Sequence, residues 1–172
     1  MIESQFNQMM LRAEKLFART EEDQFSEYLL LDAEIAVSKE PIIWSERLKL
    51  KDRKIQEGYR WGDPWDSAWL HLTGVVPKSW KGSDICYKLD LGGEGLLFDD
   101  AGCPIFAVTD STCYGYYRKF EYRFRQPAKS GEKLDLWIEV AANSLFGIKR
   151  NEDPHLRETS PNGSFDASCR IM

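Results

Sequence analysis

Hydrophobic residues recur at two different spacings along this chain of 172 residues. In the first segment they return every three or four positions, with charged residues between them, as on one face of a helix: Phe6, Met9, Met10, Ala13, Leu16 and Phe17. Thr20 with Asp23 three residues later resembles a capping box that opens a second helix, although the following EYLLLDAEIAV also suits an extended chain. We therefore expect a helical extension over residues 1–39, with one or two helices.

From about residue 42 the hydrophobic spacing changes to two. Apolar and polar residues alternate in four segments, which begin near Ala68, Ile85, Phe120 and Leu134. One apolar and one polar face per strand is typical of antiparallel sheets packed on a shared core. With PIIWSERLKL and PIFAVTD added, the pattern predicts about seven or eight short strands. The predicted fold is mainly β, an antiparallel β-sandwich of the jelly-roll type over residues 40–147.

The last segment, residues 148–172, lacks a hydrophobic period that could bury one face. It is rich in polar residues and contains two prolines, as linkers and tails often do. We expect it to lead towards a further, catalytic domain.

Charge and hydropathy limit the classes of binding partner that this chain can have. The net charge is −5, from 23 basic and 28 acidic residues, which argues against nucleic acid as a partner. The basic positions between Arg118 and Arg125 alternate with aromatic residues and are interpreted as the solvated face of a strand. Neither a signal peptide nor an apolar run of about 18 residues is present, so a cytoplasmic protein without membrane contact is expected. Four scattered cysteines are expected to be reduced thiols: Cys86, Cys103, Cys113 and Cys169.

Candidate catalytic chemistry is sparse. The two histidines, His71 and His155, lack neighbours at the spacing of a zinc site, so neither a metal nor a cofactor is expected in this chain. The sequence also lacks a Gly-x-Ser-x-Gly nucleophile turn and a phosphate-binding glycine loop. No residue is therefore predicted to be catalytic.

Paired carboxylates remain, because glycosidases use two of them. Candidates are Glu94, Asp99, Asp100, Asp63 and Asp66. The FDDAGCP segment is interpreted as a hairpin turn, with Asp and Gly in the roles that turns require. Glu94 is different, because glycines on both sides allow a close backbone approach or a positive φ and leave its carboxylate exposed.

Four tryptophans lie within twenty residues: Trp61, Trp65, Trp69 and Trp80. Tryptophan rings fill the cores of sandwiches, and they also stack on the faces of sugars. Core packing is the favoured interpretation for each ring, with contact to a sugar or a neighbouring domain as the alternative.

The order of these motifs resembles the Ams1-like N-terminal domain of glycoside hydrolase family 38 α-mannosidases, of the cytosolic and bacterial type. The resemblance covers about residues 40–147, through WGDPWDSAWLHLTGVVPKSWKG, LDLGGEGLLFDDAGCPI and DLWIEVAANSLFG. The VVPKSWKG turn is also similar to galactose-binding-like domains of β-galactosidase-type enzymes. Besides the four tryptophans, the matching positions are Gly62, Pro77, Gly82, Gly93, Glu94, Gly95, Gly102, Leu145, Phe146 and Gly147.

The resemblance implies a β-sandwich that precedes a catalytic domain, in which histidines and aspartates hold zinc and α-mannosides are hydrolysed with retention. None of those catalytic residues can be transferred to this chain. The leading hypothesis is thus a non-catalytic domain whose partners are the catalytic domain, mannosides as candidate ligands, or further copies of itself. One alternative is a free-standing carbohydrate-binding jelly roll that uses exposed tryptophans with Glu94. A small glycosidase or lyase based on Glu94 and an aspartate is a third hypothesis, which leaves the question of enzymatic activity open.

Overall fold

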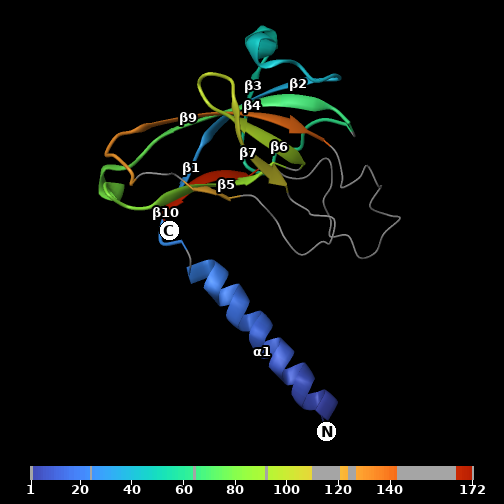
Figure 1. The fold of residues 1–172 in the computed structure, drawn as a ribbon, viewed down its shortest axis with the longest axis vertical. Coiled ribbons are helices and arrows are strands. Elements are labelled where there is room, and N and C mark those ends of the chain that lie inside the picture. Colours follow the sequence, from blue (N-terminus) through green and yellow to red (C-terminus); the bar gives the residue numbers. More distant parts are fainter. Residues whose placement is uncertain are drawn as a thin grey trace.

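The computed structural model describes residues 2–23, 25–63, 65–91, 93–109, 121–123, 127–142 and 166–171. These residues form one α-helix, two short 3-10 helices and ten strands (Figure 1). The helices are α1 (Ile2–Asp23), η1 (Trp44–Lys49) and η2 (Lys78–Trp80). The strands are β1 (Tyr28–Leu30), β2 (Asp32–Ser38), β3 (Arg53–Ile55), β4 (Ser67–Val75), β5 (Ile85–Asp90), β6 (Glu94–Phe98), β7 (Pro104–Thr109), β8 (Glu121–Arg123), β9 (Lys133–Ala141) and β10 (Asp166–Ile171).

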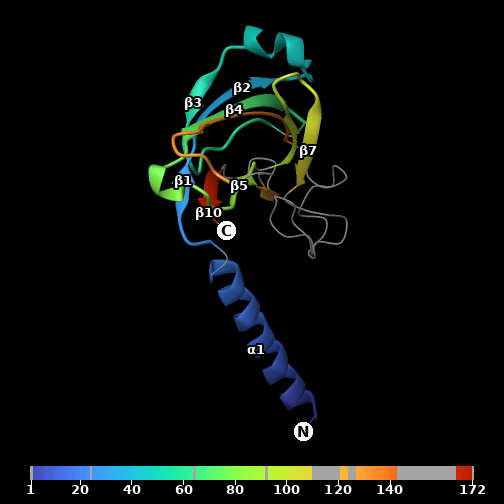
Figure 2. The ribbon, with the colours of Figure 1, turned by 60° about the vertical axis from the view of Figure 1, so that its left-hand side comes forward.

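The strands form two antiparallel sheets that lie on opposite sides of one core (Figures 1 and 2). The smaller sheet has the order β1-β10-β5-β8, and the larger has the order β3-β2-β4-β9-β6-β7. Side chains from both sheets meet in the core, for example Leu70 and Ile138 from the larger sheet and Ile85 and Leu89 from the smaller. The predicted mainly β, antiparallel sandwich is therefore confirmed.

The period of two places the core residues as expected. In β9, Leu134, Leu136, Ile138 and Val140 are buried, while the residues between them are half-buried or exposed. In β4 the pairing with β9 continues over all nine residues, so the longest strands form the centre of the larger sheet. The face of this sheet that points away from the core is called the outer face below.

Of the one or two N-terminal helices expected, the described residues contain one, and the extended alternative holds for the segment after it. Thr20 lies inside α1, and its hydroxyl donates a hydrogen bond to the carbonyl oxygen of Leu16 at 2.8 Å, so it does not cap a new helix. Residues 28–30 and 32–38 are strands instead, and β2 pairs with β4 over its full length. The alternating burial of Ala33 and Ile35 shows why an extended chain is favoured here. The sandwich thus includes strands that precede residue 40.

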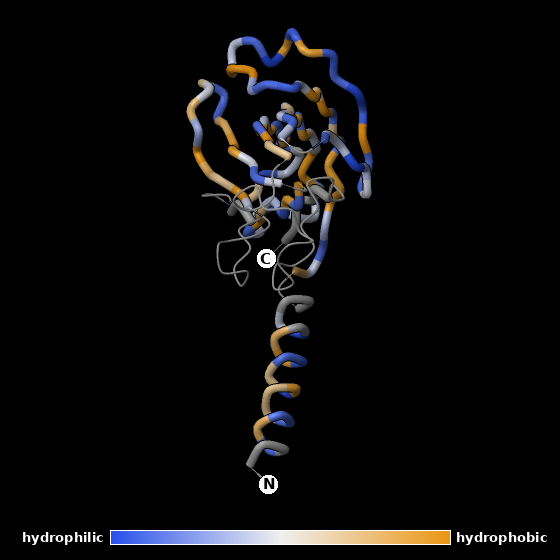
Figure 3. Tube along the Cα trace, turned by 90° about the vertical axis from the view of Figure 1, so that its right-hand side faces the viewer, coloured by the Kyte–Doolittle hydropathy of each residue, from blue (hydrophilic) through white to orange (hydrophobic). Residues whose placement is uncertain are grey.

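Helix α1 extends away from the sandwich (Figures 1 and 2). Apolar and polar positions alternate around it as predicted for an amphipathic helix (Figure 3). Its large apolar side chains are exposed, including Phe6, Met9, Leu16 and Phe17. In the described residues, no helix is long and apolar enough to cross a membrane.

The expectation of a tail without regular structure is wrong for residues 166–171. They form β10, which pairs with β1 on one side and with β5 on the other. Local periodicity could not reveal this strand, because its neighbours come from distant parts of the chain. Of the basic segment, residues 121–123 form β8 at the edge of the smaller sheet, and the rest lies outside the described residues, as do Cys113 and His155.

Candidate functional site

The segment 93–104 contains the predicted hairpin, which joins β6 to β7. The backbone N–H of Gly102 donates to the carbonyl oxygen of Asp99 at 2.9 Å, and Gly102 has a φ of 81°. The Asp99 carboxylate accepts hydrogen bonds from the backbone N–H groups of Ala101 and Cys103, at 3.0 and 2.8 Å. Asp99 thus stabilises the turn, which confirms the hairpin interpretation.

Glu94 is the first residue of β6 and is exposed. The two described neighbours are glycines because neighbouring atoms come very close. A Cβ at Gly93 would lie 2.2 Å from the carbonyl oxygen of Ala141, and one at Gly95 would lie 2.6 Å from Leu91 Cδ1. Neither glycine has a positive φ, so close approach is the reason for both. The tight packing of β6 on β9 fixes the backbone that carries Glu94.

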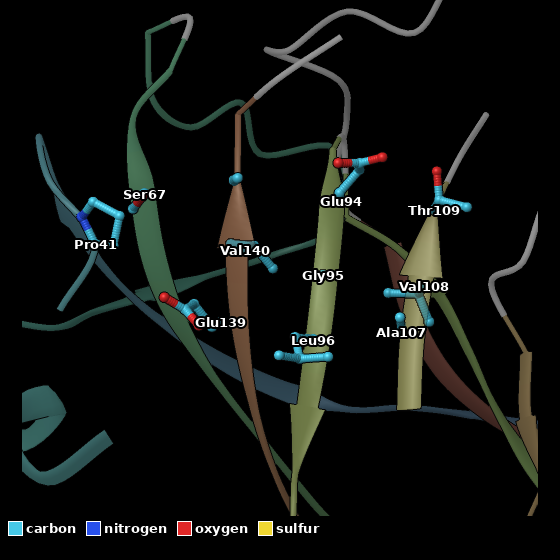
Figure 4. Close-up of a pocket in the computed structure, with 11 residues that line it drawn as sticks. Pro41, Ser67, Glu94, Gly95, Leu96, Ala107, Val108, Thr109, Glu139 and Val140 are labelled. Atoms are coloured by element: carbon cyan, nitrogen blue, oxygen red, sulfur yellow. The ribbon is translucent and has the colours of Figure 1, made fainter. Parts of the chain in front are cut away.

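A cavity of about 540 Å³ lies on the outer face beside Glu94 (Figure 4). Its walls come from β4, β9, β6 and β7 and from the segment before η1. The lining residues are Pro41, Ser67, Glu94, Gly95, Leu96, Ala107, Val108, Thr109, Glu139, Val140 and Ala141. Glu139 brings a second carboxylate, and burial raises its pKa above the usual range of glutamate. The sequence analysis missed Glu139, because only the strand register places it beside Leu96.

The other half of the outer face is filled by an aromatic cluster of Trp44, Trp69, Phe98 and Trp137. Trp44 stacks on Phe98 with 5.4 Å between ring centroids, and its edge meets Trp69 at 5.7 Å. The Arg47 guanidinium lies 3.4 Å from the centroid of the Trp44 ring. Burial lowers the pKa of Arg47. The 3-10 helix η1 supplies Trp44 and Arg47 and so covers this half.

Three of the four predicted tryptophans are structural. Trp61, Trp69 and Trp80 are each at most 2% exposed. Their indole N–H groups donate to the carbonyl oxygen of Leu91, the carbonyl oxygen of Ile42 and the carboxylate of Glu27, respectively. Trp61 and Trp80 belong to the core between the sheets, as the core interpretation expects, whereas Trp69 is buried in the aromatic cluster of the outer face.

Trp65 differs from the other three, because its side chain is 65% exposed. It has a φ of 75°, a region that bulky residues rarely occupy. Its backbone N–H donates to the carbonyl oxygen of Ala142 at 2.8 Å, and the Ala142 N–H donates to the carbonyl oxygen of Asp66 at 2.8 Å. These bonds hold the Trp65 loop, residues 61–66, against the end of β9; Pro64 lies outside the described residues.

The Asp66 side chain holds the same loop from inside. It is 8% exposed, and one of its oxygens accepts a hydrogen bond from the backbone N–H of Asp63 at 2.9 Å. Lys39 Nζ lies 3.0 Å from each of the two aspartates. The Asp63 N–H and, after it, Lys39 lower the pKa of Asp66. Gly62 has a φ of 67° and packs on Asp66, where a Cβ would lie 3.2 Å from Asp66 Cβ.

Two further positions of the family motif, Pro77 and Gly82, lie in turns of the sandwich. Pro77 precedes η2, and Gly82 has a φ of 86° and donates its N–H to the carbonyl oxygen of Ala128 at 2.8 Å. His71 stacks on Trp137 and lies 3.0 Å from Asp135. Within the described ranges, no three His, Cys, Asp or Glu residues are grouped so as to hold a metal ion. Leu145, Phe146 and Gly147 lie outside the described residues.

The same fold occurs in parts of two larger solved structures. The chain is similar in structure to β-glucuronidase from Ruminococcus gnavus, with a TM-score of 0.53 and 10% identity over 86% of this chain and 29% of that one. A second similar structure is β-glucosidase from Kluyveromyces marxianus in complex with glucose, with a TM-score of 0.50 and 14% identity over 81% of this chain and 15% of that one. At such low identity these likenesses show the fold alone.

Sequence similarity shows the family to which the chain belongs. Residues 29–167 match the family model described as "Alpha-mannosidase, jelly roll domain", and the chain belongs to this family. It is 28% identical over 120 residues to alpha-mannosidase G of Dictyostelium discoideum, which covers 70% of this chain and 10% of that protein. It is 27% identical over 113 residues to human alpha-mannosidase 2C1, over 64% of this chain and 10% of that protein. The chain therefore spans about a tenth of the length of these relatives, and the resemblance seen in the sequence is confirmed.

Proposed function

We propose that this chain is the non-catalytic N-terminal β-sandwich domain of a cytoplasmic α-mannosidase and that it packs on the catalytic domain of that enzyme. Two observations support the proposal: the match to the jelly-roll family over residues 29–167 and the much greater length of the related mannosidases. In this arrangement the zinc ion and the catalytic carboxylates belong to the catalytic domain, and the sandwich supplies a rigid contact surface.

The observation that carries the proposed contact is Trp65. Tryptophan is enriched among the residues that contribute most to protein interfaces. The ring of Trp65 is exposed, and its backbone has a strained φ that the bonds to Ala142 and the carboxylate of Asp66 maintain. We therefore assign the Trp65 loop to the contact with the catalytic domain.

The test uses the Trp65→Gly variant in the full α-mannosidase that contains this domain. Glycine accepts a φ of 75° without strain, so the sandwich should keep its fold while the aromatic contact is lost. We expect earlier thermal unfolding of the full enzyme, or separate unfolding of its two parts, and unchanged unfolding of the sandwich alone. The matched control, Trp65→Phe, keeps an aromatic ring and should cause a smaller change. Unchanged unfolding of the full enzyme with Trp65→Gly would show that this loop is not the contact.

A second measurement addresses catalysis. The purified chain should not hydrolyse a chromogenic α-mannoside, with or without added zinc. Turnover that follows the pure protein and disappears in Glu94→Gln would overturn the assignment as a non-catalytic domain. That result would favour the small-glycosidase hypothesis instead.

A further inference from the structure

We propose that the cavity beside Glu94 and Glu139 is a binding site for a neutral saccharide such as an α-mannoside. The site lies on the outer face of the larger sheet and goes beyond the contact with a catalytic domain (Figure 4). It also gives the alternative hypothesis of a carbohydrate-binding sandwich a specific location.

The register of β6 and β9 places the two carboxylates on one face. Leu96 is opposite Glu139 and Glu94 is opposite Ala141, so the two glutamates are diagonal neighbours across the strand pair. Diagonal positions on one face are about 7–8 Å apart. A carboxylate has several acceptor lone pairs, so a pyranose ring that lies between them can donate hydroxyl hydrogen bonds to both, beside the interaction that Glu94 already makes.

The charge of the lining selects the class of ligand. The eleven described lining residues include two carboxylates and the hydroxyls of Ser67 and Thr109, and no basic side chain. Negative charge disfavours phosphorylated sugars and uronic acids. Glu139 also gains more than an exposed carboxylate does from a hydroxyl donor, because its environment is partly desolvated. Membership of an α-mannosidase family favours a neutral hexose over a cation.

The walls are fixed without a ligand. Trp69 Nε1 donates to the carbonyl oxygen of Ile42 at 2.8 Å, which holds the segment with Pro41 against the sheet. On the other side β7 pairs with β6 and brings Ala107 opposite Leu96. Between these walls, Leu96 and Ala107 offer apolar surface to the C–H face of a sugar ring. The volume of about 540 Å³ lies within the range of small-molecule sites.

The test is a titration of the whole chain with methyl α-mannoside and with mannobiose, followed by backbone amide shifts in NMR spectra. Saturable shifts at Leu96, Ala107 and Glu139 are expected, with a dissociation constant on the order of millimolar. Glu139→Gln should weaken binding about fivefold or more, since it removes the charged acceptor. Ala107→Trp should abolish binding by filling the cavity. The matched control is Glu57→Gln, an exposed carboxylate in a turn away from the cavity, and it should bind as the unchanged chain does.

Three outcomes would overturn the inference. The first is the lack of saturable shifts up to about 50 mM sugar, a range in which weak sites are still detected. The second is equal affinity in the Ala107→Trp variant, provided that its spectrum is that of a folded protein. The third is binding of a diamine such as putrescine at these residues without binding of the mannosides.

The outcome is independent of the contact with a catalytic domain. Trp65→Gly should leave sugar affinity unchanged, and Glu139→Gln should leave the unfolding of the two parts of the full enzyme coupled. If the chain binds sugar but Trp65→Gly leaves the unfolding of the full enzyme unchanged, this site is supported and the proposed role of Trp65 is removed. If Trp65→Gly uncouples the unfolding of the two parts but the chain binds no sugar, the contact at Trp65 is supported and the saccharide site is overturned.

Discussion

The outer face of the larger sheet has two halves that differ sharply, although β4, β6 and β9 contribute side chains to both. One half carries the aromatic cluster, and the other carries the cavity. Along β4, β6 and β9 a step of two residues separates an aromatic residue from a lining residue: Trp69 from Ser67, Phe98 from Leu96, and Trp137 from Glu139. Small and acidic side chains leave one half open, whereas rings and η1 close the other. Aromatic content therefore marks the structural half of this face, not the candidate binding site.

The largest expected effect comes from opening the filled half. Trp69→Ala removes a buried ring and its hydrogen bond to Ile42 and should lower the free energy of unfolding by about 3–5 kcal/mol. Urea unfolding followed by circular dichroism measures this. Leu96→Ala, in the open half, is the matched comparison, and its half-buried side chain should contribute only about 1 kcal/mol. Equal losses for the two variants would contradict the division of the face.

A smaller effect is expected for the carboxylate that holds the Trp65 loop. Asp66→Asn should lower the free energy of unfolding at pH 7 by about 1–3 kcal/mol, because a charged acceptor of the Asp63 N–H is lost. The pKa of Asp66 is lowered in the folded chain, so this stabilisation is present above the unfolded pKa and is lost as the pH falls through the folded pKa. The difference between the two proteins should shrink at about pH 3.

The control for Asp66 is Asp63→Asn. The Asp63 side chain is 79% exposed, so solvent screens its pairing with Lys39, and Asp63→Asn should lose clearly less stability than Asp66→Asn. If Asp66→Asn and Asp63→Asn lose the same stability, or if the loss for Asp66→Asn is equal at pH 7 and pH 3, the role given to Asp66 is incorrect.

Glu139 should respond in the opposite direction. Burial raises its pKa in the folded chain, so its contribution favours folding below the unfolded pKa and is lost as the pH rises through the folded pKa. Glu139→Gln should therefore raise the midpoint of thermal unfolding slightly at pH 7 and leave it unchanged at about pH 3. A lower midpoint at pH 7 would show that the carboxylate stabilises the open half of the outer face.

The smallest effect is expected at Trp65. Trp65→Gly removes an exposed ring and relieves a strained φ, while glycine adds freedom to the unfolded chain. The free energy of unfolding of the isolated chain should change by less than about 1 kcal/mol. A loss like that of Trp69→Ala would mean that the Trp65 ring packs on the sandwich.

The sequence predicts the sandwich well where spacing alone determines burial. The alternation in β9 identifies four core residues correctly, and the Asp and Gly of the hairpin identify the turn. Prediction from the sequence fails where an element depends on strands that are distant along the chain. Strand β10 depends on β1 and β5, and Glu139 enters the candidate site only through the register of β6 with β9. The sequence also cannot distinguish the exposed Trp65 from the three buried tryptophans. The φ of Trp65 and the three indole hydrogen bonds follow from tertiary contacts.

Strand β10 has a consequence for how the protein is made. It lies between β1 and β5, so two strands from the earlier part of the chain share a neighbour that is synthesised last among them. While the nascent chain grows, the facing edges of β1 and β5 present unpaired backbone groups until residue 171 has left the ribosome. Pairing across such a separation is slow. The smaller sheet therefore cannot close until β10 has been synthesised, and until then the facing edges of β1 and β5 are open to pairing with other chains.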